Sequence, residues 1–183
     1  LYVGQHIWEK NIGFILDSLA LIKEQPFQLY MVGMGYAVRE IKQKIKELGL
    51  SHKVTLLGQI HDRERLKRID AAADLFLFPS LYDNAPLVVR EAAAMHTPAL
   101  MLQESTAAEV IKSDVNGFLT PNDKQAYADR LVWLMDHPEI LIKVGQKASN
   151  TISRSWENVM EEVILRYKDI QASYKLKHGI IKP

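Results

Sequence analysis

Short apolar runs rich in β-forming residues recur along this chain, and an amphipathic helical stretch follows most of them. The runs are nearly continuous in hydrophobicity, without the polar–apolar alternation of a strand that has one face in water. Such runs are typical of parallel strands covered by helices on both faces. Repeated strand–helix units with short connections predict an α/β fold with a doubly wound parallel, Rossmann-like sheet. The expected strands are Leu1–Val3, Leu29–Val32, Val54–Leu57, Leu75–Phe78, Ala99–Leu102 and Phe118–Thr120.

The helices are predicted from apolar residues spaced three and four apart and from end signals. Asp62 is a favoured N-cap residue, and Gly49 and His96 suit the left-handed position at a helix end. Thr106 and Glu109 have the spacing of a capping box. The expected helices are Asn11–Glu24, Val38–Leu48, Arg63–Ala73, Leu87–Met95, Asp123–Asp136, one from about Pro138, and one from Trp156 to about Tyr174.

Length and composition fit one globular domain over 1–183 that ends in a helical segment at about 123–175. The net charge of +1 does not indicate a protein that binds nucleic acid through an overall positive charge. The absence of cysteine excludes disulfides and thiolate metal sites. The six histidines have no metal-ligand spacing, so no metal is expected. The chain opens in what reads as the end of a strand, so we expect a preceding domain to be absent from this sequence.

In an open parallel sheet, ligands bind beyond the carboxyl ends of the strands, where helix N-termini converge. The loop Pro79–Pro86 is the most informative of these, because it leads into a helix that carries Glu91. Backbone amides there suit a diphosphate, and Glu91 suits ribose hydroxyls; the alternative is an ordinary turn in which Asp83 and Asn84 have no ligand. Lys10 either meets a phosphate or is solvated.

Taken in order, the segments resemble the C-terminal, donor-binding domain of GT-B-fold retaining glycosyltransferases of the glycogen-synthase-like and mannosyltransferase-like class (glycosyltransferases group 1). The resemblance covers almost the whole chain. The segments that carry it are Tyr2–Gly4 with Glu9-Lys10, Met31–Gly35, Val54–Ile60, Ala71–Ser80, the acidic pair Asp83 and Glu91, and Asn116–Leu119.

This resemblance implies a role for each site residue. Glu91 would bind the ribose, Asp83 would lie near the donor sugar, and Lys10 would balance phosphate charge; Lys10 and Asp83 are the expected catalytic residues. Such enzymes transfer the sugar with retention, and electrostatic stabilisation of the diphosphate leaving group is commonly a large catalytic effect. The expected donor-binding residues are Glu91, Gln5, Gly33, Ala85, Leu87 and Val88 (backbone amides towards the diphosphate), and Gln59 and Ile60 (backbone groups towards the base).

Three positions depart from the family pattern. Gln5 stands where the family usually has Arg, and a neutral amide cannot replace a guanidinium on phosphate. The glycine-rich donor loop of the family is here Asn84-Ala85-Pro86, and Pro86 donates no N–H. The customary Gly-Gly before a later helix is Ser105-Thr106.

The expected function is transfer of a hexose from a nucleoside-diphosphate sugar, UDP- or GDP-linked, to a glycan or lipid acceptor. No cofactor is expected besides this donor substrate. The acceptor, and any peripheral contact with the inner membrane face, would belong to the missing N-terminal domain, and the cytoplasm is the expected location. The alternatives are a non-catalytic nucleotide-sugar-binding module, which Gln5 and Pro86 favour slightly, and a sugar-nucleotide epimerase, for which further acid and base residues are lacking.

In the resembled family the last helix crosses back to the N-terminal domain. The stripe of Trp156, Val159, Val163, Tyr167 and Ile170 would then be partly uncovered. We expect this helix to be less buried towards Tyr167–Tyr174 than at Trp156.

Overall fold

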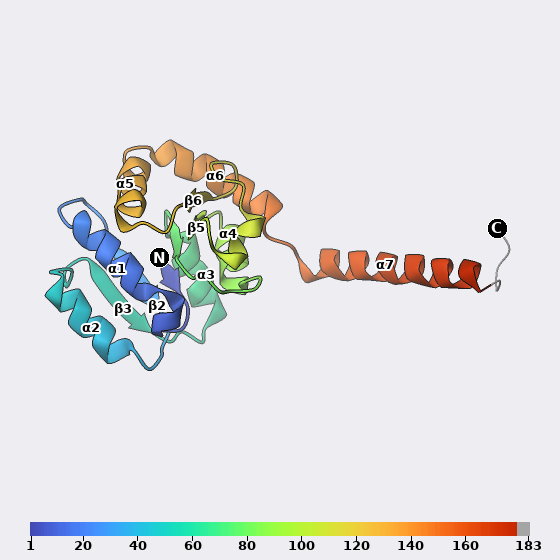
Figure 1. Cartoon of the computed structure of the whole chain (residues 1–183), viewed down its shortest axis with the longest axis horizontal. Coiled ribbons are helices and arrows are strands. Elements are labelled where there is room, and N and C mark those ends of the chain that lie inside the picture. The colour runs from blue at the N-terminus through green and yellow to red at the C-terminus, as the bar shows by residue number, and fades with distance from the viewer. Residues whose placement is uncertain (179–183) are drawn as a thin grey trace. The chain divides into compact units, whose positions relative to one another are not determined.

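The computed structural model describes residues 1–178 and divides the chain into two units, Leu1–Ser153 and a second that begins at Arg154. The first unit contains two three-stranded parallel sheets (Figure 1). One has the order β1-β2-β3 and the other the order β4-β5-β6. The strands are β1 (Tyr2–Val3), β2 (Leu29–Val32), β3 (Val54–Gly58), β4 (Phe76–Phe78), β5 (Ala99–Leu102) and β6 (Phe118–Thr120).

Backbone hydrogen bonds at Leu1 join the two sheets side by side. Leu1 N donates to Leu75 O at 2.9 Å, and Leu77 N donates to Leu1 O at 2.8 Å, which is the pattern of a parallel pair. The six strands therefore run in the order 3-2-1-4-5-6, the doubly wound Rossmann order, with the reversal of winding between β1 and β4. The predicted fold class is confirmed.

Strand side chains alternate between two buried cores, one on each face of the sheet. Leu77 and Leu100 belong to the first core, whereas Phe76, Phe78 and Met101 belong to the second. Because both faces are covered, the strands read as continuous apolar runs.

Helices from different parts of the chain cover each face. Ile15 of α1, Ile41 of α2 and Leu131 of α5 pack in the first core, and Val89 of α4 packs in the second with partly buried Leu66 of α3. The helices of the first unit are α1 (Ile12–Leu21), α2 (Val38–Glu47), α3 (Arg63–Ala71), α4 (Leu87–Ala94), α5 (Lys124–Met135) and α6 (Pro138–Thr151), with short 3₁₀ helices η1 (Trp8–Lys10) and η2 (Thr106–Val110).

Three of the predicted helix-end signals are confirmed. Asp62 Oδ1 accepts hydrogen bonds from the amides of Glu64 and Arg65 at the start of α3. Gly49 and His96 have left-handed φ angles of 73° and 64° just after α2 and α4.

The predictions for the start of η2 and for the end of α1 are wrong. The capping residue of η2 is Ser105, not Thr106, because the Thr106 hydroxyl instead bonds carbonyls of the loop after β4. Helix α1 ends at Leu21, three residues before the predicted Glu24. Pro26 disfavours helical backbone in the residue before it, and the chain has already turned at that point.

The second unit contains one long helix, α7 (Trp156–Lys177), which Ser155 caps and which extends three residues beyond the predicted end. The predicted gradient of burial is wrong: Trp156 is 74% exposed, and Tyr167 and Tyr174 are 64% and 58% exposed. Residues 179–183 of the tail lie outside the described residues. No helix within residues 1–178 is both long enough and apolar enough to cross a membrane.

Candidate functional site

Two predicted site residues meet at the carboxyl edge of the sheet, where the winding reverses. Lys10 lies in η1 after β1, and Asp83 lies in the loop Pro79–Pro86 after β4, which we call the donor loop. Lys10 Nζ is 2.6 Å from Asp83 Oδ1, and both side chains are largely covered. The strand order thus places a paired cation and anion where this fold class binds its ligands.

The second carboxylate oxygen of Asp83 adds an unused acceptor to this pair. Asp83 Oδ2 is buried and has no hydrogen-bond partner within residues 1–178. Tyr2 lies in the same region, and burial first and Asp83 second raise the pKa of its phenol. The Tyr2 hydroxyl stays protonated and donates to Gln5 O at 2.9 Å. The described chain therefore leaves the hydrogen-bonding capacity of Asp83 Oδ2 unsatisfied.

The N-terminus of α4 is open at the same edge. Pro86 is its N-cap residue, and no side chain among residues 1–178 caps the helix. The first amides of a helix have no partner inside it, and the helix dipole makes this end attractive to anions. Leu87 is exposed and Val88 half-buried, and the two predicted amides belong to the first turn of α4.

Glu91 lies one turn further along α4, with its side chain 43% exposed. Arg63 at the start of α3 is its ion-pair partner, with Arg63 Nη1 at 3.7 Å from Glu91 Oε1. This contact is long and exposed, so it contributes little to stability and leaves Glu91 free to accept hydrogen bonds.

Gly33 is required where the loops after β1 and β2 approach each other. Its φ is 137°, and a Cβ atom at this position would lie 1.8 Å from Gly4 O. The predicted base-binding turn follows β3 nearby in the sheet: Gln59 is exposed, and Ile60 is half-buried against the second core. Gly33 N donates to Gly58 O at 2.9 Å, so the loop after β2 is hydrogen-bonded to the end of β3, just before the predicted base-binding turn.

Two other predicted site residues, Gln5 and Ala85, lie at the same edge of the sheet, and neither has a charged side chain. Gln5 is exposed in the loop after β1, and its neutral side chain is where the resemblance expects a guanidinium. Ala85 lies in the donor loop with φ 46°, a left-handed conformation that is costly for a residue with a Cβ atom. Strain of this kind persists only where the surroundings over-determine the backbone.

The structure adds residues that the sequence did not single out. Asn11, at φ 56°, donates from Nδ2 to Pro79 O at 3.1 Å and ties the loop after β1 to the donor loop. His6 is fully buried, both ring nitrogens lack a partner within residues 1–178, and burial lowers its pKa. The surrounding sequence, with Gln5 before His6 and Glu9-Lys10 soon after it, carries no signal of this burial. No cluster of three or more His, Asp or Glu side chains in the described chain could hold a metal ion.

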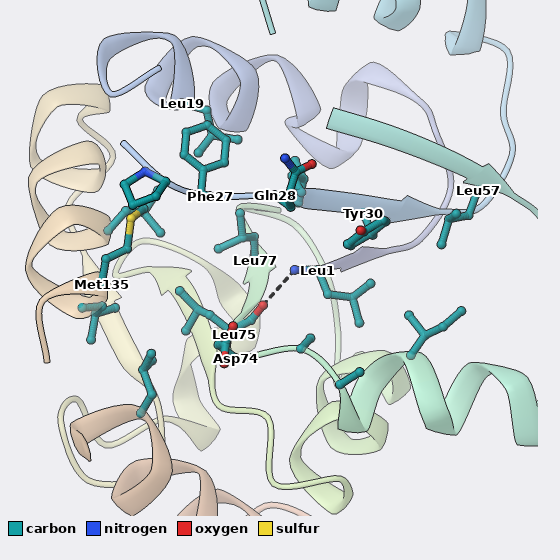
Figure 2. Close-up of a pocket in the computed structure, with 18 of the residues that line it drawn as sticks. Leu1, Leu19, Phe27, Gln28, Tyr30, Leu57, Asp74, Leu75, Leu77 and Met135 are labelled. Carbon is teal, nitrogen blue, oxygen red and sulfur yellow. Dashed lines mark hydrogen bonds between the residues drawn. The ribbon is translucent and has the colours of Figure 1, made fainter. Parts of the chain in front are cut away.

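An apolar pocket of about 630 Å³ lies elsewhere, towards the amino ends of β2 and β4. Figure 2 shows Leu1 in this pocket near Tyr30, with its backbone nitrogen bonded to Leu75 O. None of the predicted site residues lines it. Ligands of parallel α/β sheets bind at the carboxyl edge, so this pocket is separate from the candidate site.

The chain is similar in sequence and in fold to several known proteins. The chain is 28% identical over 173 residues to the uncharacterized glycosyltransferase MJ1607 of Methanocaldococcus jannaschii, covering 92% of this chain and 44% of that protein. The sucrose-phosphate synthase of Thermosynechococcus elongatus superposes with a TM-score of 0.81 at 26% identity, over 94% of this chain and 45% of that one. Anabaena Alr3699/HepE, solved in complex with UDP, superposes with a TM-score of 0.70 at 26% identity, over 81% of this chain and 43% of that one.

The chain therefore spans about half the length of the proteins it resembles. The family model for glycosyl transferases group 1 matches residues 1–151, which include all the candidate residues and most of the described chain. By this match, this chain belongs to the glycosyl transferases group 1 family.

Proposed function

We propose that this chain is the donor-binding half of an enzyme that transfers a sugar from a nucleoside-diphosphate sugar to a glycan or lipid acceptor with retention. The observation that carries the proposal is the uncapped N-terminus of α4 beside the Lys10–Asp83 pair, with Glu91 one turn behind it. The amides of Leu87 and Val88 would meet the diphosphate.

The chemistry proposed for this half is electrostatic. Departure of the diphosphate leaves negative charge on its oxygens, and preorganised donors aimed at that charge lower the barrier. The α4 amides and the Lys10 ammonium supply such donors, while Asp83 would lie near the transferred sugar. No nucleophile from this half and no metal are assigned to the reaction.

The proposed base contacts come from the turn after β3, where Gln59 and Ile60 offer backbone groups. The donor is UDP- or GDP-linked, and the UDP complex of Anabaena Alr3699/HepE supports UDP as the first probe. The acceptor site is assigned to an N-terminal domain outside this sequence. The proposed location is the cytoplasm, with any contact to the inner membrane face made through that domain.

Titration calorimetry of this chain with UDP, GDP and ADP tests the proposal. We expect one nucleotide to bind and Glu91→Ala to weaken its binding by about 1–3 kcal/mol, the cost of losing a hydrogen bond to a charged group. Glu47→Ala, at the far end of α2, is the matched control and should leave the affinity unchanged. Binding of none of the three nucleotides would overturn the proposal, and unchanged affinity in Glu91→Ala would remove Glu91 from the site.

A non-catalytic nucleotide-sugar-binding module is the second candidate. The exposed neutral Gln5 favours it, because the diphosphate then meets one charged side chain where the resemblance expects two. Both candidates bind nucleotide, so sugar transfer by the full-length protein distinguishes them.

A further inference from the structure

Two residues that follow β5 hold three backbone carbonyls of the donor loop. The Ser105 hydroxyl donates to Ser80 O at 2.7 Å in a buried position. The Thr106 hydroxyl donates to Asp83 O at 2.9 Å, and the Thr106 amide donates to Leu81 O at 3.0 Å. We call Ser105 and Thr106 the β5 clamp. They occupy the positions where the resembled family has two glycines, which carry no hydroxyl.

The opposite side of the donor loop is held by the segment after β1. Asn11 Nδ2 donates to Pro79 O, and Lys10 pairs with the Asp83 carboxylate. Asp83 is thus fixed at two points, through its side chain by Lys10 and through its carbonyl by Thr106.

Fixing Asp83 has a consequence for the residues that follow it. Ala85 has φ 46°, and a left-handed residue other than glycine costs about 1–2 kcal/mol. Asp83 lies two residues before Ala85, and α4 begins two residues after it. With both ends held, the chain between them has to turn through this strained conformation. The β5 clamp is therefore suited to maintaining the strain that aims the first amides of α4.

We propose that Thr106 is a positioning residue of the donor loop: its hydroxyl fixes the backbone of Asp83, and through it the Asp83 carboxylate and the first amides of α4. The position of the loop follows from the contacts above. Only the identity of the ligand rests on the proposed function.

Thr106→Val tests the hydroxyl selectively. Valine has nearly the shape of threonine and keeps the hydrogen bond from the amide of residue 106 to Leu81 O, so the variant loses the hydroxyl contacts to Asp83 O at 2.9 Å and to Leu81 O at 3.3 Å. Thr106 is exposed, so we expect the variant to remain folded. Thr106→Ser is the matched control, because it retains the hydroxyl.

The first measurement is hydrogen exchange of the backbone amide of residue 106, which donates to Leu81 O, in the ligand-free chain and relative to the intrinsic exchange rate of each variant. We expect exchange about 5-fold faster in Thr106→Val, the effect of losing about 1 kcal/mol of hydrogen bonding, and near wild-type exchange in Thr106→Ser. The second measurement is UDP affinity, which should fall about 5-fold in Thr106→Val and recover in Thr106→Ser, while the melting temperature of Thr106→Val falls by only about 2–4 °C.

The outcomes separate this proposal from the proposed function. Wild-type exchange in Thr106→Val, or equal acceleration in the Val and Ser variants, would overturn the positioning role. Absence of UDP, GDP and ADP binding to the wild-type chain would overturn the proposed function alone, because the exchange measurement needs no ligand and still decides whether Thr106 holds the loop.

Discussion

Lys10 and Asp83 are 73 residues apart in the sequence, and their charged groups lie 2.6 Å apart at the point where the winding of the sheet reverses. An ammonium has three donors, and this contact uses one of them, so Lys10 can bind Asp83 and an incoming phosphate together. Asp83 thereby keeps the Lys10 ammonium at the site before a ligand binds.

Lys10→Ala should abolish detectable binding of a nucleoside diphosphate, because Gln5 carries no charge to take its place. The Asp83 carboxylate would then face the diphosphate without a neutralising partner. Calorimetry with UDP measures the effect, and Lys42→Ala on the exposed side of α2 removes the same charge away from the site. Affinity within about threefold of wild type in Lys10→Ala would show that the diphosphate does not lie at Lys10.

Gln5→Arg should strengthen binding of the same nucleotide by about tenfold, the smaller end of what a hydrogen bond to a charged group contributes. The Gln5 side chain is exposed, and its backbone carbonyl, which accepts the Tyr2 hydroxyl, is kept by any substitution. Gln5→Met is the neutral control and should not strengthen binding. If Gln5→Arg has no effect, the loop after β1 does not follow the geometry that the resemblance implies.

The strands were predictable because helices cover both faces of the sheet. β2, β5 and β6 have the predicted bounds, and their apolar runs need no alternation because their side chains, apart from the exposed Tyr30, meet a core. Caps such as Asp62 were predictable for a similar reason, since the residue and the amides it binds are neighbours in the sequence.

Contacts between segments that are distant in the sequence could not be predicted from local sequence patterns. Lys10 and Asp83 were each singled out, but their pairing depends on β1 lying beside β4. Thr106 was predicted to cap its own helix, whereas its hydroxyl bonds the donor loop more than 20 residues earlier. The left-handed backbone of Ala85 has no local signal either, because no glycine or asparagine stands at that position.

Asp70 gives a prediction about the dependence of stability on pH. It is almost fully buried in α3, and burial first and the nearby Glu91 second raise the pKa of its carboxyl to about 6. Because the folded-state pKa lies above the unfolded value, this group favours folding when protonated. That contribution is complete below about pH 4 and is lost as the pH rises through about 6.

Asp70→Asn removes this titration with little change of shape. We expect the variant to exceed the wild type in free energy of unfolding by up to about 3 kcal/mol at pH 8, with the difference shrinking towards pH 4. Urea denaturation at several pH values measures it, with exposed Asp129→Asn as the control. Parallel pH profiles for wild type and Asp70→Asn would contradict the assignment.

Ala85→Gly should stabilise the chain, because glycine adopts φ 46° without the clash that a Cβ atom creates there. The relief of about 1 kcal/mol is partly offset by the greater freedom of glycine in the unfolded chain, so we expect a gain of about 0.5–1 kcal/mol, or roughly 2 °C in melting temperature. Ala94→Gly, at the C-terminal end of α4, is the control with ordinary helical backbone and should destabilise the chain by up to a similar amount. Destabilisation by both substitutions would show that Ala85 is not strained, and it would remove the argument that the β5 clamp maintains this conformation.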